Sequence, residues 1–494
     1  MAEPAPARWP LIPGLAALAV ALLSAFMLER ERAGVEMTHL QLEDTPATLY
    51  SAADAPAPLV VIAHGFGGSR QMMEAISLTL ARSGFAALAF DFHGHGRHAL
   101  PMSPEVDDLD GTTAQLAAQT RAVATAALEL PETDGLAGLV GHSMATDVII
   151  RAARDLPGVP GLVAISMYSE AVTDSYPRRL LIVSGEWEAR LREVALEAVH
   201  MVDADAAEGE TARDGAVARR AVAAPNVEHV GVLYDPVTLA ETRDWLAAGL
   251  GREAWGTLAR TGPWLAALMI SLVVAFGAVS RLIAHRAPAP TELPVAAFAV
   301  AVLLPALPAV AAAVFIDWTL FGFAGFGRLA AFFGVWGVVQ VLVLRVAGWR
   351  PAPLHPWPAL LLGLWALGVF AVALDRYGAA FLPAGERLPL AAALLIPALP
   401  FALADWALVQ GAPLWRRLAA RLVILAALGA AIFAVPDRLG LVFTVLPVLL
   451  LYWLAYGTMA RWTAGRAGET ATALPMAVVL AWSIAASTPL FAAP

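Results

Sequence analysis

A serine stands in "GHSMATD" at 141–147, after the apolar run "LAGLV" and before the helix-like "VIIRAARD". A serine hydroxyl is a poor nucleophile unless a base lies beside it. A sharp strand-to-helix turn exposes such a hydroxyl, and small residues must flank the turn because the two backbones pass closely. Gly141 and Ala145 fill these two positions. We therefore predict that Ser143 is a nucleophile presented by this turn.

Residues that suit a base and an acid follow Ser143 along the chain. His229 lies in "NVEHVGV", after the last strand-like run and before a helix predicted at 236–250. Glu186 and Glu188 lie in "VSGEWEARL", after the preceding strand-like run. Nucleophile, acid and histidine in this chain order are typical of catalytic triads built on a parallel sheet.

An upstream stretch, "VVIAHGFGGSR", ends another strand-like run and is rich in glycine. Glycines allow a backbone N–H to approach the carbonyl oxygen of a substrate. An oxyanion needs about two such donors at hydrogen-bond distance. The predicted donors are the amides of Phe66 and of Met144, the residue after the nucleophile.

The elements that position these residues alternate between short apolar runs and amphipathic stretches. This alternation predicts a mainly parallel sheet with helices on both faces. The predicted strands are 57–64, 85–91, 136–142, 161–167, 179–185 and 218–224, and the predicted helices include 70–83, 112–130 and 143–154.

Taken together, this part of the chain resembles the α/β-hydrolase superfamily. "HGFGG" matches the family's oxyanion loop, "DFHGHGR" the loop after its fourth strand, "GHSMA" its nucleophile elbow, "SGEWE" its acid loop and "EH" its histidine loop. The resemblance covers roughly residues 35–250 and implies that fold. It favours Glu188 over Glu186 as the acid, because the family's acid usually lies three residues past the strand-ending glycine. Ala145, and a glutamate in place of the commoner aspartate, depart from the family pattern.

The resemblance also implies which residues line the site. These are His64, Gly65, Gly67, His142, Asp91 and His95. His93, His95 and His98 cluster near Asp91, and clustered histidines can bind zinc. The family loop accounts for Asp91 and His95 without a metal, so neither a metal nor a cofactor is expected.

The composition of the 494-residue chain indicates a membrane protein. It is 59% hydrophobic and 15% charged, against about 45–50% and about 25% in soluble domains. Runs long enough to span a bilayer, which takes about 20 residues, give nine predicted helices: 10–28, 263–280, 294–316, 329–345, 357–374, 388–410, 418–435, 439–458 and 472–490. A cleaved signal peptide is the alternative for the first run. The predicted domains are an N-terminal helix with short flanks (1–32), the α/β-hydrolase domain (33–250) and an all-α transmembrane domain (251–494).

The placement of arginine predicts the orientation of these helices, because cytoplasmic loops carry an excess of basic residues. The richest loops are 281–293, 345–356, 411–421 and 459–471, which we therefore place in the cytoplasm. The hydrolase domain then falls outside, on what we expect to be a bacterial inner or plasma membrane. The net charge of −9 argues against a nucleic-acid partner, and the absence of cysteine excludes disulfides and thiolate sites.

These features predict a multi-pass membrane serine hydrolase of esterase or lipase type. Its substrate would be an acyl ester, such as one of a lipid or a lipid-linked molecule, and membrane lipids would be its partners. The order of one helix, a hydrolase domain and a multi-span block is similar to that of inositol deacylases acting on GPI anchors. Two alternatives stay open. One is a transporter or scaffold with a hydrolase-like binding domain, and the other is a peptidase or acyltransferase that uses the same triad. The sequence does not determine the oligomeric state.

Overall fold

A computed structural model describes residues 11–52, 55–288 and 293–493 of the chain. It divides into two compact units. The α/β unit comprises Ser24–Ala266 and Arg376–Ala380, and the helical unit comprises Met1–Leu23, Ala267–Asp375 and Phe381–Pro494.

A nine-stranded sheet forms the centre of the α/β unit, with the strand order β1-β2-β4-β3-β5-β6-β7-β9-β8. The run from β4 through β3, β5, β6 and β7 to β9 is parallel, and the other neighbouring pairs are antiparallel. The bounds are β1 (Glu36–Leu42), β2 (Thr45–Ser51), β3 (Ala57–Ala63), β4 (Ala86–Phe90), β5 (Thr133–His142), β6 (Leu162–Ile165), β7 (Arg179–Gly185), β8 (Thr211–Asp214) and β9 (Val217–Ala224).

The six predicted strands are the six parallel ones, and sequence patterning missed β1, β2 and β8. The missed strands lie toward the two edges of the sheet. β1 and β8 keep much of their surface exposed and mix polar with apolar residues. A continuous apolar run is typical of a strand buried on both faces. A search for such runs therefore does not find strands whose sequences mix polar and apolar residues.

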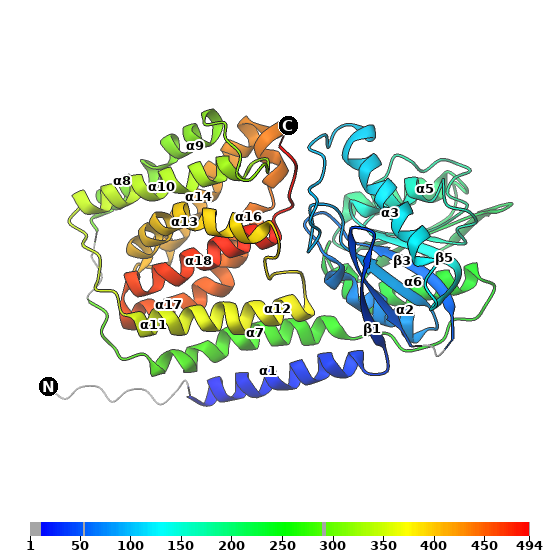
Figure 1. Cartoon of the computed structure of the whole chain (residues 1–494), viewed down its shortest axis with the longest axis horizontal. Helices are drawn as coiled ribbons and strands as arrows, with labels where there is room; N and C mark the ends of the chain where they lie inside the picture. The colour runs from blue at the N-terminus through cyan, green and yellow to red at the C-terminus, as the bar shows by residue number, and fades with distance from the viewer. Residues whose placement is uncertain (1–10, 53–54, 289–292, 494) are drawn as a thin grey trace. The chain divides into compact units, whose positions relative to one another are not determined.

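Helices cover both faces of the sheet (Figure 1). On one face α2 and α6 pack together over a core of alternate strand residues, such as Val60 and Ile62 of β3 and Leu181 and Val183 of β7. α3 and α4 form a second packed pair. The bounds are η1 (Arg70–Met73), α2 (Glu74–Arg82), η2 (Leu109–Thr113), α3 (Ala114–Ala127), α4 (Ala145–Ala152), α5 (Ala189–His200), η3 (Gly231–Tyr234) and α6 (Pro236–Gly249).

Nine helical stretches of the described residues are long and apolar enough to cross a membrane, and they coincide with the nine predicted spans. The third predicted span is broken near Pro305 into α8 and α9. The bounds are α1 (Leu11–Arg32), α7 (Thr261–Val279), η4 (Ser280–Leu282), α8 (Val295–Leu303), α9 (Ala306–Phe315), α10 (Phe326–Val346), α11 (Pro356–Gly363), η5 (Leu364–Ala371), α12 (Val372–Tyr377), α13 (Arg387–Val409), α14 (Leu414–Ala434), α15 (Pro436–Leu439), η6 (Gly440–Val442), α16 (Val445–Leu451), η7 (Tyr452–Tyr456), α17 (Gly457–Ala467) and α18 (Glu469–Ser487).

The centre of the helical unit is formed by α13, which packs against both α10 and α18. Gly337 of α10 allows one close approach, since a Cβ placed there would lie 2.3 Å from the backbone nitrogen of Phe401. Small residues at such crossings are how apolar helices pack when water supplies no hydrophobic drive between them.

Candidate active site

Ser143 directly follows β5 and precedes α4. Its φ is +55°, a conformation that is uncommon for a residue with a side chain. Gly141 is required beside it, because a Cβ at that position would lie 2.7 Å from the carbonyl oxygen of Ala145. Ala145 itself is fully buried in the first turn of α4. The alanine that departs from the family pattern is thus accommodated within the strand–turn–helix geometry expected for the elbow.

The ends of the central strands are level with one another. His142, at the end of β5, pairs with Ile165 of β6, and Ile165 pairs with Val183 of β7. Residues that follow these strand ends therefore meet at one edge of the sheet, which is where open α/β sheets usually bind their ligands.

The structure brings Ser143, His229 and Glu188 into one hydrogen-bonded chain. His229 Nε2 lies 2.8 Å from Ser143 Oγ, and His229 Nδ1 lies 2.5 Å from Glu188 Oε1. A carboxylate accepts hydrogen bonds only, so Nδ1 carries the imidazole proton and the lone pair of Nε2 faces the serine. This is the arrangement in which a histidine can take the proton of a serine hydroxyl.

Of the two candidate acids, only Glu188 reaches His229 in this way. The side chain of Glu188 is 7% exposed. Glu186 is exposed, and its Oε2 accepts a hydrogen bond from the backbone N–H of Asn226 at 2.8 Å. The two carboxylates are two residues apart in a turn, so their side chains leave the backbone in different directions.

Glu188 is held by groups that the sequence analysis did not identify. Ser166 Oγ donates to Glu188 Oε2 at 2.7 Å, and the N–H of Gly185 donates to the same oxygen at 2.6 Å. Burial alone would raise the pKa of Glu188, but the hydrogen bonds from His229, Ser166 and Gly185 lower it below its usual value. Glu188 is consequently kept as a carboxylate.

Ser166 follows β6 and, like Ser143, has a positive φ, of +54°. The only signal in the sequence was a small hydroxyl residue at the end of a predicted strand, "GLVAISM". Its role depends on β6 lying between the strands of the nucleophile and the acid, which the sequence did not determine.

His142 is buried next to the nucleophile and holds the histidine loop. Its Nε2 donates to the backbone carbonyl of His229 at 2.8 Å. Burial, and then the nearby His229, lower the pKa of His142 to about 4. It is therefore neutral at neutral pH and positions His229 through the backbone.

The glycine-rich segment lies against the elbow. A Cβ placed on Gly65 would lie 3.0 Å from Cβ of Ser143, so the segment passes within van der Waals distance of the nucleophile. Phe66 is the next residue, and its ring contacts that of His95, with centroids 5.5 Å apart. The assignment of the Phe66 and Met144 amides as oxyanion donors remains a prediction.

Two further predicted site-lining residues, His64 and Asp91, stabilise the loops. His64 is buried, and its Nε2 accepts the N–H of Phe92 at 3.1 Å. Asp91 is fully buried in an ion pair with Arg70 and accepts the backbone N–H groups of Arg70 and Arg97. Its carboxylate therefore shapes the loop 91–98 and is not available to a substrate.

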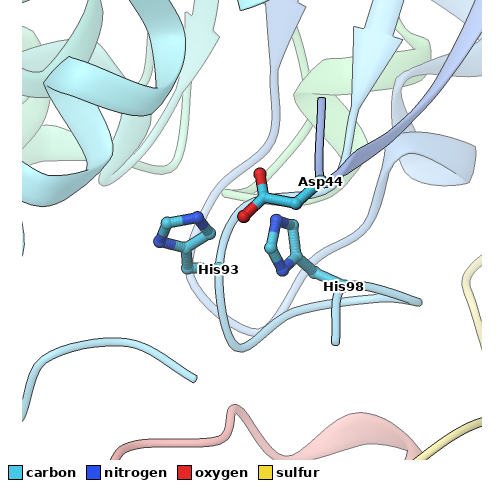
Figure 2. Close-up of side chains that lie close together, drawn as sticks. All are labelled: Asp44, His93 and His98. Carbon is cyan, nitrogen blue, oxygen red and sulfur yellow. The ribbon is translucent and has the colours of Figure 1, made fainter. Parts of the chain in front are cut away.

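The histidine cluster lies beside the carboxylate of Asp44, whereas the sequence analysis placed it near Asp91. His93 and His98 lie beside Asp44, in the β1–β2 turn, with ligand atoms within 4.8 Å of one another (Figure 2). Burial, and then His93, lower the pKa of His98 to about 4, so the ring is neutral. His98 Nδ1 accepts the N–H of Leu100 at 3.0 Å, which places its proton on Nε2. Neither nitrogen of His98 then offers a free lone pair to a metal ion.

The strand order, the elbow and the Ser–His–Glu chain define the α/β-hydrolase fold for this unit, as the resemblance implied. A family model described as serine aminopeptidase, S33, matches residues 54–218. No curated protein matches the chain.

Similar solved structures include a hormone-sensitive lipase from a metagenome library, with 15% identity, a TM-score of 0.33, and coverage of 51% of this chain and 100% of that one. A carboxylesterase from Bacillus subtilis has 14% identity and a TM-score of 0.33, covering 48% and 99%. A dienelactone hydrolase from Anabaena variabilis has 16% identity and a TM-score of 0.33, covering 44% and 96%.

Proposed function

We propose that the α/β unit is a serine hydrolase of acyl esters and that the apolar helices hold it in a membrane. The observation that carries the proposal is the hydrogen-bonded chain Ser143–His229–Glu188, with distances of 2.8 and 2.5 Å. A binding module has no need of a serine, a histidine and a carboxylate in that geometry.

The reaction follows from this arrangement. Ser143 Oγ attacks the ester carbonyl while His229 Nε2 takes its proton. Glu188 orients His229 and stabilises the imidazolium that forms. The protonated His229 then donates its proton to the leaving alcohol as the C–O bond breaks, leaving an acyl-enzyme. Water, deprotonated by His229, attacks the acyl-enzyme and releases the acid and free Ser143.

The tetrahedral intermediate needs donors for its oxyanion. We assign this role to the amides of Phe66 and Met144. Support comes from the glycine-rich segment, whose Gly65 lies against Ser143. Each such donor is worth roughly 10²–10³-fold in rate.

The surroundings of the triad favour an apolar acyl group. Three large side chains are adjacent to the catalytic residues in sequence or follow the same strand ends: Tyr168, Trp187 and Val230, which are 63%, 67% and 42% exposed. Trp187 directly precedes Glu188, and Val230 directly follows His229. Exposed apolar residues gathered near a site commonly mark a surface for an apolar ligand. A lipid or lipid-linked ester is the substrate class that they suit.

We further propose that the protein is a multi-pass membrane protein with the α/β unit outside the cytoplasm. The nine apolar helices found among the described residues support membrane insertion, and the arginine-rich loops support the orientation. Protease accessibility of the α/β unit in intact spheroplasts tests the orientation. Protection of that unit would place it in the cytoplasm.

The decisive experiment is labelling of the detergent-purified chain with a fluorophosphonate, followed by hydrolysis of short-chain and long-chain p-nitrophenyl esters. We expect the wild type to be labelled and active, and the Ser143→Ala variant to lose both properties. A folded wild type that resists labelling would refute the proposed hydrolase and favour the binding or transport alternative.

An amide substrate is the second candidate, because the matching family model is described as a serine aminopeptidase. The same three residues can cleave an amide if His229 protonates the leaving amine. Aminoacyl p-nitroanilides, tested beside the esters, separate the two candidates. Turnover of the anilides at rates similar to those of the esters would favour the peptidase.

A further inference from the structure

The helical unit contains a cavity that the proposed hydrolase does not use. Its volume is about 490 Å³, within the range of roughly 300–1,000 Å³ that holds small ligands. Trp406 and Gln410 near the end of α13, Arg417 in α14 and Arg461 in α17 line it, together with His285 after η4. The cavity thus gathers residues that are far apart in the sequence.

The described part of the lining is cationic without a matching acid. Among the residues that the structure describes there, Arg417 and Arg461 are positive, and none is an aspartate or a glutamate. In the part of the chain that the structure describes, neither arginine forms an ion pair, and Nε of Arg417 is buried without a hydrogen-bond partner. Two uncompensated guanidinium groups at one cavity favour an anion with several oxygen acceptors.

A third arginine adds to the positive charge near the cavity. Arg421 lies one turn beyond Arg417 on α14 and, like Arg417, is close enough to influence Arg461 electrostatically. Arg421 is itself paired with Asp405 of α13, at 3.5 Å. Among the described residues Arg417 and Arg461 have no such carboxylate partner, so their positive charge is not offset by an ion pair.

The position of the cavity along the membrane-spanning helices indicates whether the anion belongs to a lipid headgroup. Its lining comes from where the spans Thr261–Leu282, Arg387–Val409, Leu414–Ala434 and Pro436–Ala467 end or begin. Span ends lie at the level of lipid headgroups. Trp406, largely buried at the cavity, is a side chain typical of that interface.

From these observations we propose that this cavity is a binding site for a phosphate group, presented by the headgroup of a membrane lipid. Arg417 and Arg461 donate to the phosphate oxygens in the manner usual for guanidinium groups. The site lies on the side that the arginine distribution assigns to the cytoplasm, and it is independent of the proposed ester hydrolysis.

Arginines at span ends are also expected simply from the positive-inside rule. The chain offers a control for that explanation. Arg345 and Arg350 belong to the same set of arginine-rich loops, are exposed, and do not line the cavity. A topological role is shared by both pairs, whereas a binding role belongs only to Arg417 and Arg461.

The test is lipid retention by the full-length chain in detergent, measured by native mass spectrometry. Three probes are titrated: phosphatidylglycerol, a diacylglycerol with the same acyl chains, and inorganic phosphate. The proteins are wild type, Arg417→Gln/Arg461→Gln, Arg417→Lys/Arg461→Lys and the control Arg345→Gln/Arg350→Gln. Size-exclusion profiles and melting temperatures without lipid establish that each variant is folded.

We expect the wild type to bind phosphatidylglycerol and not diacylglycerol. The glutamine pair at the cavity should weaken this binding about tenfold or more, the lysine pair should retain part of it, and the control pair should leave it unchanged. Equal retention by the cavity variant and the control would overturn the site. Saturable binding of inorganic phosphate without phosphatidylglycerol would support the phosphate site and exclude a lipid as its source.

Discussion

Asp405, within a helix of the helical unit, is held differently from the buried carboxylates at the strand ends of the α/β unit. In the α/β unit, Asp91 is fully buried and accepts hydrogen bonds from the backbone and from Arg70. Glu188 likewise has three donors. In the helical unit Asp405 is 2% exposed, yet its oxygens have no hydrogen-bond partner among the described residues and its ion pair is long, at 3.5 Å. Where strands end, backbone N–H groups are available to a carboxylate. Within a helix they are already used. Asp375 and Glu469 of the helical unit do accept backbone N–H groups, but from residues outside their own helices.

This contrast explains where chemistry is possible in each unit. The open ends of parallel strands supply donors and acceptors that hold side chains in one geometry, so the α/β unit can build a catalytic chain. The helices satisfy their own backbones, and in the cavity described above the ligand-binding groups come from side chains near their ends. Four experiments test this difference between the two units.

The two glutamates of the acid loop give the largest contrast. Glu188→Gln should reduce kcat by about 10⁴-fold, because the imidazole loses the carboxylate that fixes its tautomer and stabilises its charged form. Glu186→Gln is the matched control and should change kcat by less than about tenfold, since the Glu186 side chain accepts a hydrogen bond from the backbone of Asn226 and not from His229. Steady-state hydrolysis of a soluble ester measures both. A larger loss of kcat in Glu186→Gln than in Glu188→Gln would identify Glu186 as the acid of the triad.

His142 makes the stability of the α/β unit depend on pH. Its pKa is about 4 in the folded chain and about 6.5 when unfolded, so the unfolded chain binds more protons between these values. The stabilisation is complete above pH 6.5 and is lost as the pH falls toward 4, by up to about 3 kcal/mol. Melting temperatures between pH 4 and pH 7 should fall less steeply for His142→Gln than for the wild type. If the melting temperatures of the two proteins fell equally with pH, His142 would not be the source of the pH dependence.

In the helical unit, packing should respond to a single methyl group. Gly337→Ala forces a Cβ against the backbone of Phe401 and should destabilise this unit by about 1–3 kcal/mol. Gly429→Ala in α14 meets no atom within 4 Å and serves as the control, with no loss expected. Thermal unfolding in detergent, followed by a probe in the helical unit, compares them. Ester hydrolysis should be unaffected at temperatures where both variants are folded.

Ser166 should show the smallest effect. Ser166→Ala removes one of three donors to Glu188 and should lower kcat about tenfold with little change in KM. Ser184→Ala is the control, because Ser184 is equally buried, lies on the next strand, and its hydroxyl has no partner among the described residues. A rise in KM instead of a fall in kcat would mean that Ser166 shapes the substrate site and does not act through Glu188.

Much of the architecture could be predicted from patterns that a single segment carries by itself. The six parallel strands were continuous apolar runs, and the nine apolar helices of the described residues are long enough to cross a bilayer. Each of these elements could therefore be recognised without reference to its neighbours. β1 and β8 were not recognised, because a strand at the edge needs an apolar face only where it is covered. β2 is largely buried, and it was missed because Thr45, Pro46 and Thr48 interrupt its apolar run.

The site was predictable as far as chain order determines it. The proximity of Ser143 and His229, and the preference for Glu188, followed from motifs at strand ends. The contribution of Ser166 and the meeting of His93 and His98 with Asp44 depend on which strands are neighbours and on where a hairpin turn reaches. These are three-dimensional facts with no counterpart in local spacing.

The level strand ends have a consequence for how the proposed hydrolase could change. Because His142, Ile165 and Val183 are paired side by side, the sheet alone sets the spacing between nucleophile and acid. The thirteen residues between Ile165 and Arg179 connect β6 to β7 and include the exposed Tyr168. Segments of this kind tolerate insertion and exchange. A new substrate preference can therefore arise by replacing that segment, while the reaction itself is inherited unchanged.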